Sequence, residues 1–312
     1  MADNAVTRLG QVNNTGLTDA LFLKVFGEVQ VAFRRKTAFM GRHFEQSVQS
    51  GKSVQFPLIG RSPGAALHTP GAEIVGRSIP QNEKVITIDG VLYTDVSIAN
   101  IDEAMNHYDV RREFTTQLGE ELAMEYDRNV ARTTILAARS AAWHPSMPGG
   151  TKIVAATART DSETLIAALF QSQVIFDGNW APEDGRFAYM LPVQYSLLAQ
   201  NTKLTSQWFG RGPGYNGVYA DGSVLKVANI ELVKTNNLPV GNVSATVSKY
   251  SVDATNTAVV VAQRRAVGTA KLRDIRLETE YTVRRQSTLL VGTYAVGHGV
   301  LRPECAIEIA VA

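Results

Sequence analysis

Residues 48–100 contain two strand patterns in which apolar and polar residues alternate. This part of the chain offers no evident partner that could bury the apolar side chains. In the second pattern, apolar side chains occupy even positions, which is the period of a half-buried strand: Ile86, Ile88, Leu92, Val96 and Ile98. A lone hairpin is only marginally stable in water, and the next segment has a helical pattern instead of a third strand. We therefore expect the hairpin to bury its apolar face against another copy of the same chain.

The tip between the two arms is rich in residues that form turns. The glycines and prolines of this stretch are Gly60, Pro63, Gly64, Pro70, Gly71, Gly76 and Pro80. Such a composition supports turns and no core. Gly90 interrupts the alternation of the second arm and predicts a bulge or bend.

A long helical pattern follows, from Asn100 to about Ala142. Asn100 is a suitable N-cap, and no proline lies between Pro80 and Pro145. Apolar residues recur at every fourth position: Val110, Phe114, Leu118, Leu122, Tyr126 and Val130. Because an α-helix has 3.6 residues per turn, this row winds around the axis, and we expect the helix to pack against several elements in turn.

The remainder of the chain mixes helix and strand patterns, which indicates an α+β fold. Helices are expected at 162–176 and 192–200, and strands at 187–191, 224–233 and 258–262. Three further strand patterns close the chain, at 273–283, 288–294 and 306–311. We expect these last three runs to pack under the long helix.

The composition bounds the class of protein. The 312 residues include 31 basic and 29 acidic side chains, so there is no global charge for a dedicated nucleic-acid binder. The single cysteine, Cys305, cannot form an intrachain disulfide, which fits a reducing cytoplasm. Neither an export signal nor an apolar stretch of about 20 residues is visible, so no membrane partner is expected.

No motif argues for catalysis, a metal or a cofactor. The histidines are scattered without metal-binding spacing: His43, His68, His107, His144 and His298. Cys305 has no histidine beside it in sequence, which favours a buried, inert thiol. Neither a nucleophile elbow nor a phosphate-binding loop occurs. We therefore predict that the protein is not an enzyme.

Residues 212–217 match the GxGxxG pattern of dinucleotide sites, so an oligomeric nucleotide-binding enzyme is the alternative from a different class. The context of this match is poor, because no clear strand precedes it, Pro213 lies inside it and no helix pattern follows it. A flexible loop is the better interpretation of these residues.

The N-terminal region ends in an amphipathic segment at 20–33. Phe22, Phe26 and Phe33 share one helix face, and we predict that they anchor an N-terminal arm. Arg34, Arg35 and Lys36 follow and make the approach to the hairpin basic.

Charge is partitioned between the long helix and the hairpin. Residues 101–144 carry eight acids and five arginines, whereas the hairpin and its approach are net basic. If the hairpin of one copy lay across the helix of the next, these charges would complement one another and set the register. We predict contacts from the hairpin residues Lys52, Arg61, Arg77 and Lys84 to acids of the helix. Those acids are Asp102, Glu103, Glu113, Glu120, Glu121 and Glu125, with Asp109 and Asp127 in the same segment.

Several stretches of this sequence resemble the major capsid protein of T-seven-like short-tailed bacteriophages. They are LFLKVFGEVQVAF (21–33), SGKSVQFPLIGR (50–61), EKVITIDG (83–90), DEAMNHYDVR (102–111), QLGEELAM (117–124), RRAVGTAKLRD (264–274) and YAVGHGVLRPE (294–304). Together they cover about a quarter of the chain, in the order of the family. Residues 145–262 depart from the family pattern, which leaves contacts around the capsid axes open.

The resemblance implies the Hong Kong ninety-seven phage capsid fold and gives names to the segments. Residues 1–45 would be the N-terminal arm, 46–99 the extended β-hairpin loop and 100–144 the spine helix of the peripheral domain. Residues 145–262 would form the axial domain, and 263–312 the returning strands of the peripheral domain.

The function implied by the resemblance is a structural one. Hexamers and pentamers of this chain would form an icosahedral shell in the virion, after assembly in the cytoplasm of a bacterial host. A scaffolding protein, a portal protein and non-specifically packaged double-stranded DNA are the implied partners. A cellular encapsulating shell of the same fold, enclosing proteins instead of DNA, is a further alternative.

Overall fold

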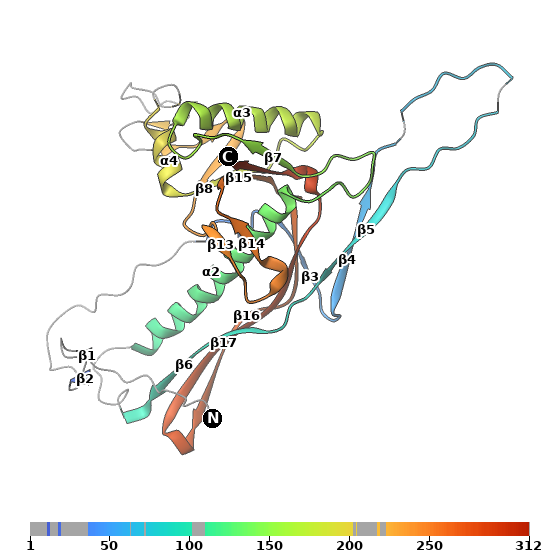
Figure 1. Cartoon of the computed structure of the whole chain (residues 1–312). Helices are drawn as coiled ribbons and strands as arrows, with labels where there is room; N and C mark the ends of the chain where they lie inside the picture. The colour runs from blue at the N-terminus through green and yellow to red at the C-terminus, as the bar shows by residue number, and fades with distance from the viewer. Residues whose placement is uncertain are drawn as a thin grey trace. The chain divides into compact units, whose positions relative to one another are not determined.

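The computed structural model describes residues 11–12, 18–19, 37–62, 64–71, 73–101, 110–201, 204, 217–218 and 223–311 (Figure 1). The chain divides into two compact units. The first comprises Met1–Lys36, Asp89–Tyr126 and Leu272–Val296, and the second comprises Thr37–Ile88, Asp127–Lys271 and Gly297–Ala312. Each unit combines segments that are distant in sequence, and the five segment boundaries expected above stay a prediction.

The first unit packs the beginning of the long helix on an antiparallel strand pair. β6 (Leu92–Ala99) pairs with β17 (Ser287–Val300), from Leu92 opposite Tyr294 to Ala99 opposite Ser287. The helix is α2 (Val110–Ala138). Ile98, Leu118 and Leu290 form a buried cluster that joins β6, α2 and β17.

The row of apolar residues on α2 contacts successive positions along β17. A Cβ on Gly292 would lie only 2.8 Å from Leu122 Cδ1, so the glycine allows the helix to approach the strand closely. One turn further, the Tyr126 ring lies 6.4 Å from the Tyr294 ring in an edge-on arrangement. Both contacts are with the same strand, so the prediction that the row packs against several elements in turn stays a prediction.

α2 ends at Ala138, four residues before the predicted end. The chain then folds back across the helix end, where Gly150 N–H donates to Ser140 O at 2.9 Å. A Cβ on Gly150 would overlap Ala137 O, so this return requires a glycine. The glycine-rich connector therefore closes the helix earlier than its hydrophobic pattern suggested.

A six-stranded mixed sheet forms the centre of the second unit, in the order β11-β12-β8-β15-β18-β7. Its strands are β7 (Thr151–Val154), β8 (Arg186–Met190), β11 (Lys226–Val227), β12 (Ile230–Lys234), β15 (Thr257–Gln263) and β18 (Ala306–Ala310). Parallel pairs join β12 to β8 and β18 to β7, and the other pairs are antiparallel. Every residue of β15 is buried, as expected for an inner strand covered on both faces.

Two helices lie next to each other beside this sheet (Figure 1), α3 (Ser162–Gly178) and α4 (Pro192–Ala199). Asp161 caps α3, because its carboxylate accepts from the backbone N–H groups of Glu163 and Thr164. Pro192 occupies the first turn of α4, where its missing N–H costs nothing. The predictions of helices at 162–176 and 192–200 and of strands at 187–191 and 258–262 are confirmed.

One strand prediction is corrected. The run at 224–233 is broken into β10 (Ser223–Val224), β11 and β12, because Ala228 and Asn229 adopt left-handed backbone angles at the turn between β11 and β12. The run at 306–311 forms β18, which lies between β15 and β7, and its packing under the long helix stays a prediction. All five residues of β18 are buried, as is typical of an inner strand that is covered on both faces.

The remaining elements complete the units. β3 (Phe44–Ser47) pairs in parallel with β16 (Val267–Thr282), within a sheet of order β3-β16-β17-β6. Short pairs join β1 (Gln11–Val12) to β2 (Thr18–Asp19), β9 (Gly217–Val218) to β10, and β13 (Gly241–Val243) to β14 (Val252–Ala254). Single turns of 3-10 helix lie at Ser248–Tyr250 (η2), Val283–Arg285 (η3) and Pro303–Cys305 (η4).

The predicted two-strand hairpin exists, but it is shorter than the pattern suggested. β4 (Ser53–Ile59) pairs with β5 (Gln81–Thr87), from Ser53 opposite Thr87 to Ile59 opposite Gln81. After Thr87 the strand is interrupted near Gly90, and β6 then pairs with β17 instead of with the first arm. The correction has a physical reason, since β17 and α2 give the apolar face of β6 the partners that the first arm lacks.

Candidate assembly interface

The base of the hairpin is buried within its own chain. Phe56 of β4 and Ile86 of β5 form a buried cluster with Ala270 and Leu301. The expectation that the whole hairpin depends on a second copy is therefore wrong for its base.

Two glycines of β17 make this burial possible. A Cβ on Gly299 would lie 2.8 Å from Ile86 Cγ1, and one on Gly297 would overlap the carbonyl oxygen of Thr87. Any larger residue at these positions would push β5 away from β17. The stretch 297–299 therefore allows the backbones to approach closely, a role that sequence reasoning did not assign to it.

Polar contacts attach the root of the hairpin, where the two strands open into the tip. Arg302 donates to Ile59 O at 3.3 Å, and Gly60 N–H donates to Pro80 O at 2.8 Å. Arg61 donates to Asn179 O, and its guanidinium lies 5.9 Å from the centre of the Trp180 ring. The predicted intersubunit residue Arg61 thus contacts its own chain.

The tip beyond this root is exposed. Among its described residues, Leu67 is 99% exposed, Ile74 79% and Val75 76%. Arg77 Nη1 donates to Gly64 O at 3.2 Å, a contact within the tip. Large apolar side chains at nearly full exposure are typical of surfaces that bind a partner.

A second exposed apolar surface lies next to the root, at the end of α3. Phe170 and Val174 are four residues apart on one exposed helix face, and Trp180 is 78% exposed. Trp180 has φ 57°, a left-handed conformation that costs energy for a bulky residue. The helix ends in a Schellman motif, with Ala181 N–H bonded to Phe176 O, and Trp180 stands where glycine is usual.

The predicted basic residues Lys52, Arg61, Arg77 and Lys84 are all exposed on the hairpin. On α2, Glu121 is exposed, while Glu113, Glu120 and Glu125 are half-buried. The hairpin cations belong to the second unit and these acids to the first, so a single chain does not test their pairing.

Several predicted residues lie outside the described part of the chain. They are the arm anchors Phe22, Phe26 and Phe33, the basic residues Arg34, Arg35 and Lys36, the acids Asp102, Glu103 and Asp109, and His107. Of the glycine-rich stretch 212–217, only Gly217 is described, at the start of β9.

Asp127 is an internal anchor and not a surface acid. Its fully buried carboxylate accepts backbone N–H bonds from Ala38, Phe39 and Met40 at 2.7–3.0 Å, and Asn237 donates to it at 2.6 Å. It therefore holds the turn that leads into β3 against α2. Its position among other helix acids gave no signal of this role.

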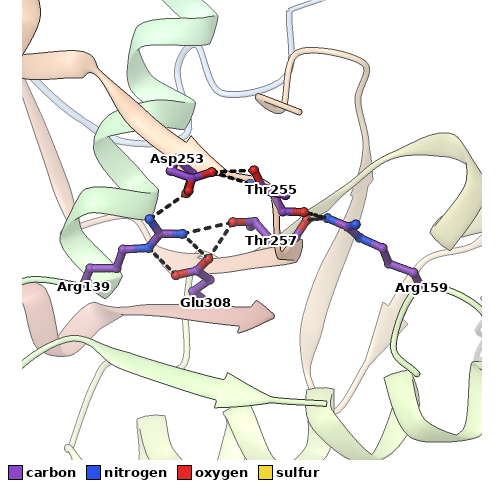
Figure 2. A network of polar contacts seen from close by, with 6 residues as sticks. All are labelled: Arg139, Arg159, Asp253, Thr255, Thr257 and Glu308. Carbon is purple, nitrogen blue, oxygen red and sulfur yellow. Dashed lines mark hydrogen bonds and ion pairs between the residues drawn. The ribbon is translucent and has the colours of Figure 1, made fainter. Parts of the chain in front are cut away.

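A second polar cluster, also missed from the sequence, ties the end of α2 to the central sheet (Figure 2). Arg139 donates to both carboxylate oxygens of the buried Glu308 at 2.6 Å, and Thr257 donates to the same carboxylate at 2.6 Å. Arg139 also donates to Asp253 O at 2.8 Å, and Arg159 binds the carbonyls of Thr255 and Thr257. Bidentate bonds of this kind fix geometry as well as adding energy.

Cys305 is buried, as expected, and burial raises the pKa of its thiol to about 12. Within the described ranges, no group of three His, Cys, Asp or Glu side chains is placed to hold a metal ion. No helix among the described residues has the length and hydropathy of a membrane span.

Comparisons with known proteins agree on one kind of protein. A family model described as "Gp10A-like: Major capsid protein" matches residues 55–310. The chain is 37% identical to the major capsid protein of Escherichia phage T7 over 319 residues, which covers 92% of this chain and 90% of that one. It is 36% identical to the major capsid protein of Enterobacteria phage T3 over 320 residues, with the same two coverages.

A solved structure of the same kind is also similar. The capsid structure of cyanophage P-SCSP1u matches with a TM-score of 0.82 at 42% identity, covering 100% of this chain and 99% of that one. The α+β phage-capsid fold expected from the sequence is confirmed by this similarity.

Proposed function

Because the chain belongs to the Gp10A-like family of major capsid proteins and is a structural subunit of a tailed-phage virion shell, we propose that its hairpin tip docks on a neighbouring copy in that shell. The observation that carries this proposal is the contrast between a base buried in its own chain and a tip whose apolar side chains are exposed. The family gives no support to the nucleotide-binding alternative at 212–217.

Burial of the tip supplies the energy of this contact. Full burial of a Leu, Ile or Val side chain contributes about 1.5–3 kcal/mol. Leu67, Ile74 and Val75 together therefore offer several kcal/mol at each contact, before the entropy of association is subtracted. Modest contacts repeated around a ring suit a shell, because wrongly placed subunits still dissociate during assembly.

Charge would set the register of the docked hairpin. Lys52, Arg77 and Lys84 extend as solvent-exposed cations along the hairpin. We infer that they face the acids of a neighbour's helix, namely Asp102, Glu103, Glu113, Glu120, Glu121 and Glu125. Exposed pairs add little affinity individually, but their pattern disfavours wrong orientations. Arg61 is assigned to the root, where it orients the tip through Asn179 and Trp180.

The wider assembly follows from the family. We propose that the chain forms hexamers and pentamers of an icosahedral shell, with the amphipathic segment carrying Phe22, Phe26 and Phe33 as an arm anchor. A scaffolding protein, a portal protein and packaged double-stranded DNA are the proposed partners, and the cytoplasm of a bacterial host is the proposed site of assembly.

The test replaces the apolar tip and leaves the buried base unchanged. In the variant Leu67→Ser/Ile74→Ser/Val75→Ser, we expect normal folding and loss of shells in electron micrographs of the full chain expressed with its assembly partners. The matched control is Val154→Ser/Val193→Ser/Val240→Ser, three other exposed valines of the second unit. Normal shell yield from the tip variant, at normal folding stability, would refute the docking role of the tip.

A further inference from the structure

Two buried histidines are joined by one threonine in the second unit. His43 Nε2 lies 2.7 Å from Thr269 Oγ1, and the same oxygen lies 2.8 Å from His298 Nδ1. All three side chains are buried. We call this set the histidine bridge (His43, Thr269 and His298). It connects the residue just before β3 to β16 and β17.

The hydrogen bonds determine where the protons of the histidine bridge lie. His43 Nδ1 lies 2.9 Å from Phe39 O, and a carbonyl only accepts, so Nδ1 carries the proton of the neutral ring. His43 Nε2 is then an acceptor, and Thr269 donates its single hydroxyl proton to it. Thr269 in turn accepts from His298 Nδ1–H. The bonds therefore run in one direction, from His298 through Thr269 to His43 and Phe39.

A protonated His43 does not fit this arrangement. With a proton on Nε2, the ring becomes a donor on both sides, and the Thr269 hydroxyl loses its acceptor. Glu45 Oε1 lies 3.4 Å from the same Nε2. Glu45 already pairs with Lys271 at 2.7 Å and accepts from Gly41 N–H at 3.3 Å. Protonation therefore removes the acceptor of the Thr269 hydroxyl proton and places the new N–H beside a carboxylate that Lys271 already pairs with.

The charges around the two rings differ. His43 faces Glu45 of β3, Asp127 of α2 and Lys271 of β16, and Arg264 donates to its backbone carbonyl at 3.5 Å. His298 faces Lys249 of η2, Lys271 and His43, and its backbone N–H donates to the Tyr250 hydroxyl at 2.9 Å. Burial lowers the pKa of His43, and burial with the neighbouring cations lowers that of His298 further. Glu45 and Asp127 favour a proton on His43, whereas the cations around His298 disfavour one there.

We propose that the histidine bridge is an acid-sensitive switch that holds the segment 37–48 on β16 while His43 is neutral and releases it when His43 is protonated. Release also opens other attachments of the segment, among them the parallel pairing of Phe44–Ser47 with Gly268–Lys271, the bonds of its turn to Asp127, the Glu45–Lys271 ion pair and the stacking of Phe39 on Tyr189. Because it leads directly into β4, its release alters the connection between the N-terminal residues and the hairpin. This inference concerns the folded subunit and does not rest on the docking of the tip.

The size of the response follows from linkage. A released His43 titrates at its ordinary value near 6.5, whereas the closed form binds the proton only at lower pH. Between these two values, release takes up one proton, so its equilibrium constant rises about tenfold for each unit of pH that is lost. If His298 is also freed, the rise approaches a hundredfold per unit. Above pH 6.5 the stabilisation is fully present.

The test is amide hydrogen exchange of the full, unassembled chain from pH 7.5 to pH 5, corrected for intrinsic exchange. We expect protection in peptides covering 37–48 to fall below pH 6.5 with a slope that approaches tenfold per pH unit, while β15 peptides stay protected. His43→Gln should flatten this profile, and the same substitution at the exposed His68 should leave it as in the wild type.

Two results would overturn the switch. One is a wild-type profile for 37–48 that does not depend on pH after correction, a measurement that needs no variant. The other is unchanged protection of 37–48 at pH 7.5 in Thr269→Val, which keeps the shape of the side chain but removes the oxygen that joins the two rings. If His43→Gln fails to fold, the wild-type profile and the Thr269→Val variant still test the proposed switch.

Discussion

The base and the tip of the hairpin are parts of one ribbon with opposite environments. At the base, Ile86 is 2% exposed and packs with Phe56, Ala270 and Leu301. At the tip, Ile74 is 79% exposed. The same residue type therefore contributes to folding at one position and remains available to a partner at the other. The difference lies in what the rest of the chain offers each position, and not in the side chain.

The hairpin therefore contains some contacts that stabilise the folded subunit and others that are available to stabilise the assembled shell. Contacts of the base lie within the second unit and should affect the free energy of unfolding. The apolar side chains Leu67, Ile74 and Val75 of the tip are exposed in the single chain and should affect only assembly. Matched substitutions at the base and the tip test whether this separation is real.

The largest effect is expected from truncation at the base. Ile86→Ala should lower the free energy of unfolding by about 2–5 kcal/mol, because it leaves a cavity against Gly268, Gly299 and Leu301. Denaturant unfolding of the unassembled full chain measures this loss. Ile74→Ala is the control, and equal losses from both variants would abolish the distinction between base and tip.

A somewhat smaller effect is expected from the buried carboxylate. Glu308→Gln should lower the free energy of unfolding by about 3 kcal/mol, the low end of the range for a broken buried ion pair. The low end applies because the Arg139 side chain left behind is 32% exposed. Glu73→Gln on the exposed tip should change the stability by less than about 0.5 kcal/mol. Urea unfolding at pH 7 compares the two.

The same carboxylate, Glu308, should make the stability of the fold depend on pH. Burial raises the pKa of Glu308, but the hydrogen bonds from Arg139 and Thr257 outweigh burial and bring the pKa below 4.5. A lowered native pKa stabilises the fold fully above 4.5, and this contribution is lost as the pH falls through the native value. The wild type should therefore lose stability below pH 4.5 more steeply than Glu308→Gln, and parallel curves would contradict this account.

A third test adds a methyl group where β5 lies against β17. Gly297→Ala should lower the free energy of unfolding by about 1–3 kcal/mol, because its Cβ would overlap the backbone of Thr87 and Ile88. Gly76→Ala on the tip has open space around its Cβ and serves as the matched control. Thermal unfolding compares them, and equal midpoints would show that β5 shifts without cost.

The smallest effect on folding is expected at the tip. Val75→Ala should change the free energy of unfolding by less than about 0.5 kcal/mol and still reduce the yield of shells. Sedimentation of assembly reactions provides the measurement. A tip variant that destabilises the isolated chain would indicate that the tip has an intrachain partner.

Local patterns predicted much of the fold because the physics behind them is local. The alternation of apolar residues placed Ile86 of β5 and Ile98 of β6 on buried faces, and Asp161 and Pro192 mark the starts of α3 and α4. The apolar row on α2 likewise gave the face that contacts β17.

The candidate interface was predicted only in part. The exposed cations Lys52, Arg77 and Lys84 lie on the hairpin as expected, but Arg61 contacts its own chain. Asp127 and Glu308 were not recognised as buried anchors. A carboxylate in a sequence carries no mark of its partners when those partners are 89 or 169 residues away, as for Ala38 and Arg139.

The sequence by itself determined the alternation of the hairpin strands, the apolar row of the main helix, the turn-rich tip and the resemblance to phage shell proteins. Each of these depends on neighbours within a few residues or on ancestry. Only the tertiary structure decided that the base of the hairpin is buried in its own chain, that β18 lies inside the central sheet and that two histidines share one threonine. These features depend on which distant segments meet, because burial and hydrogen bonding are properties of a site in space and not of a stretch of chain.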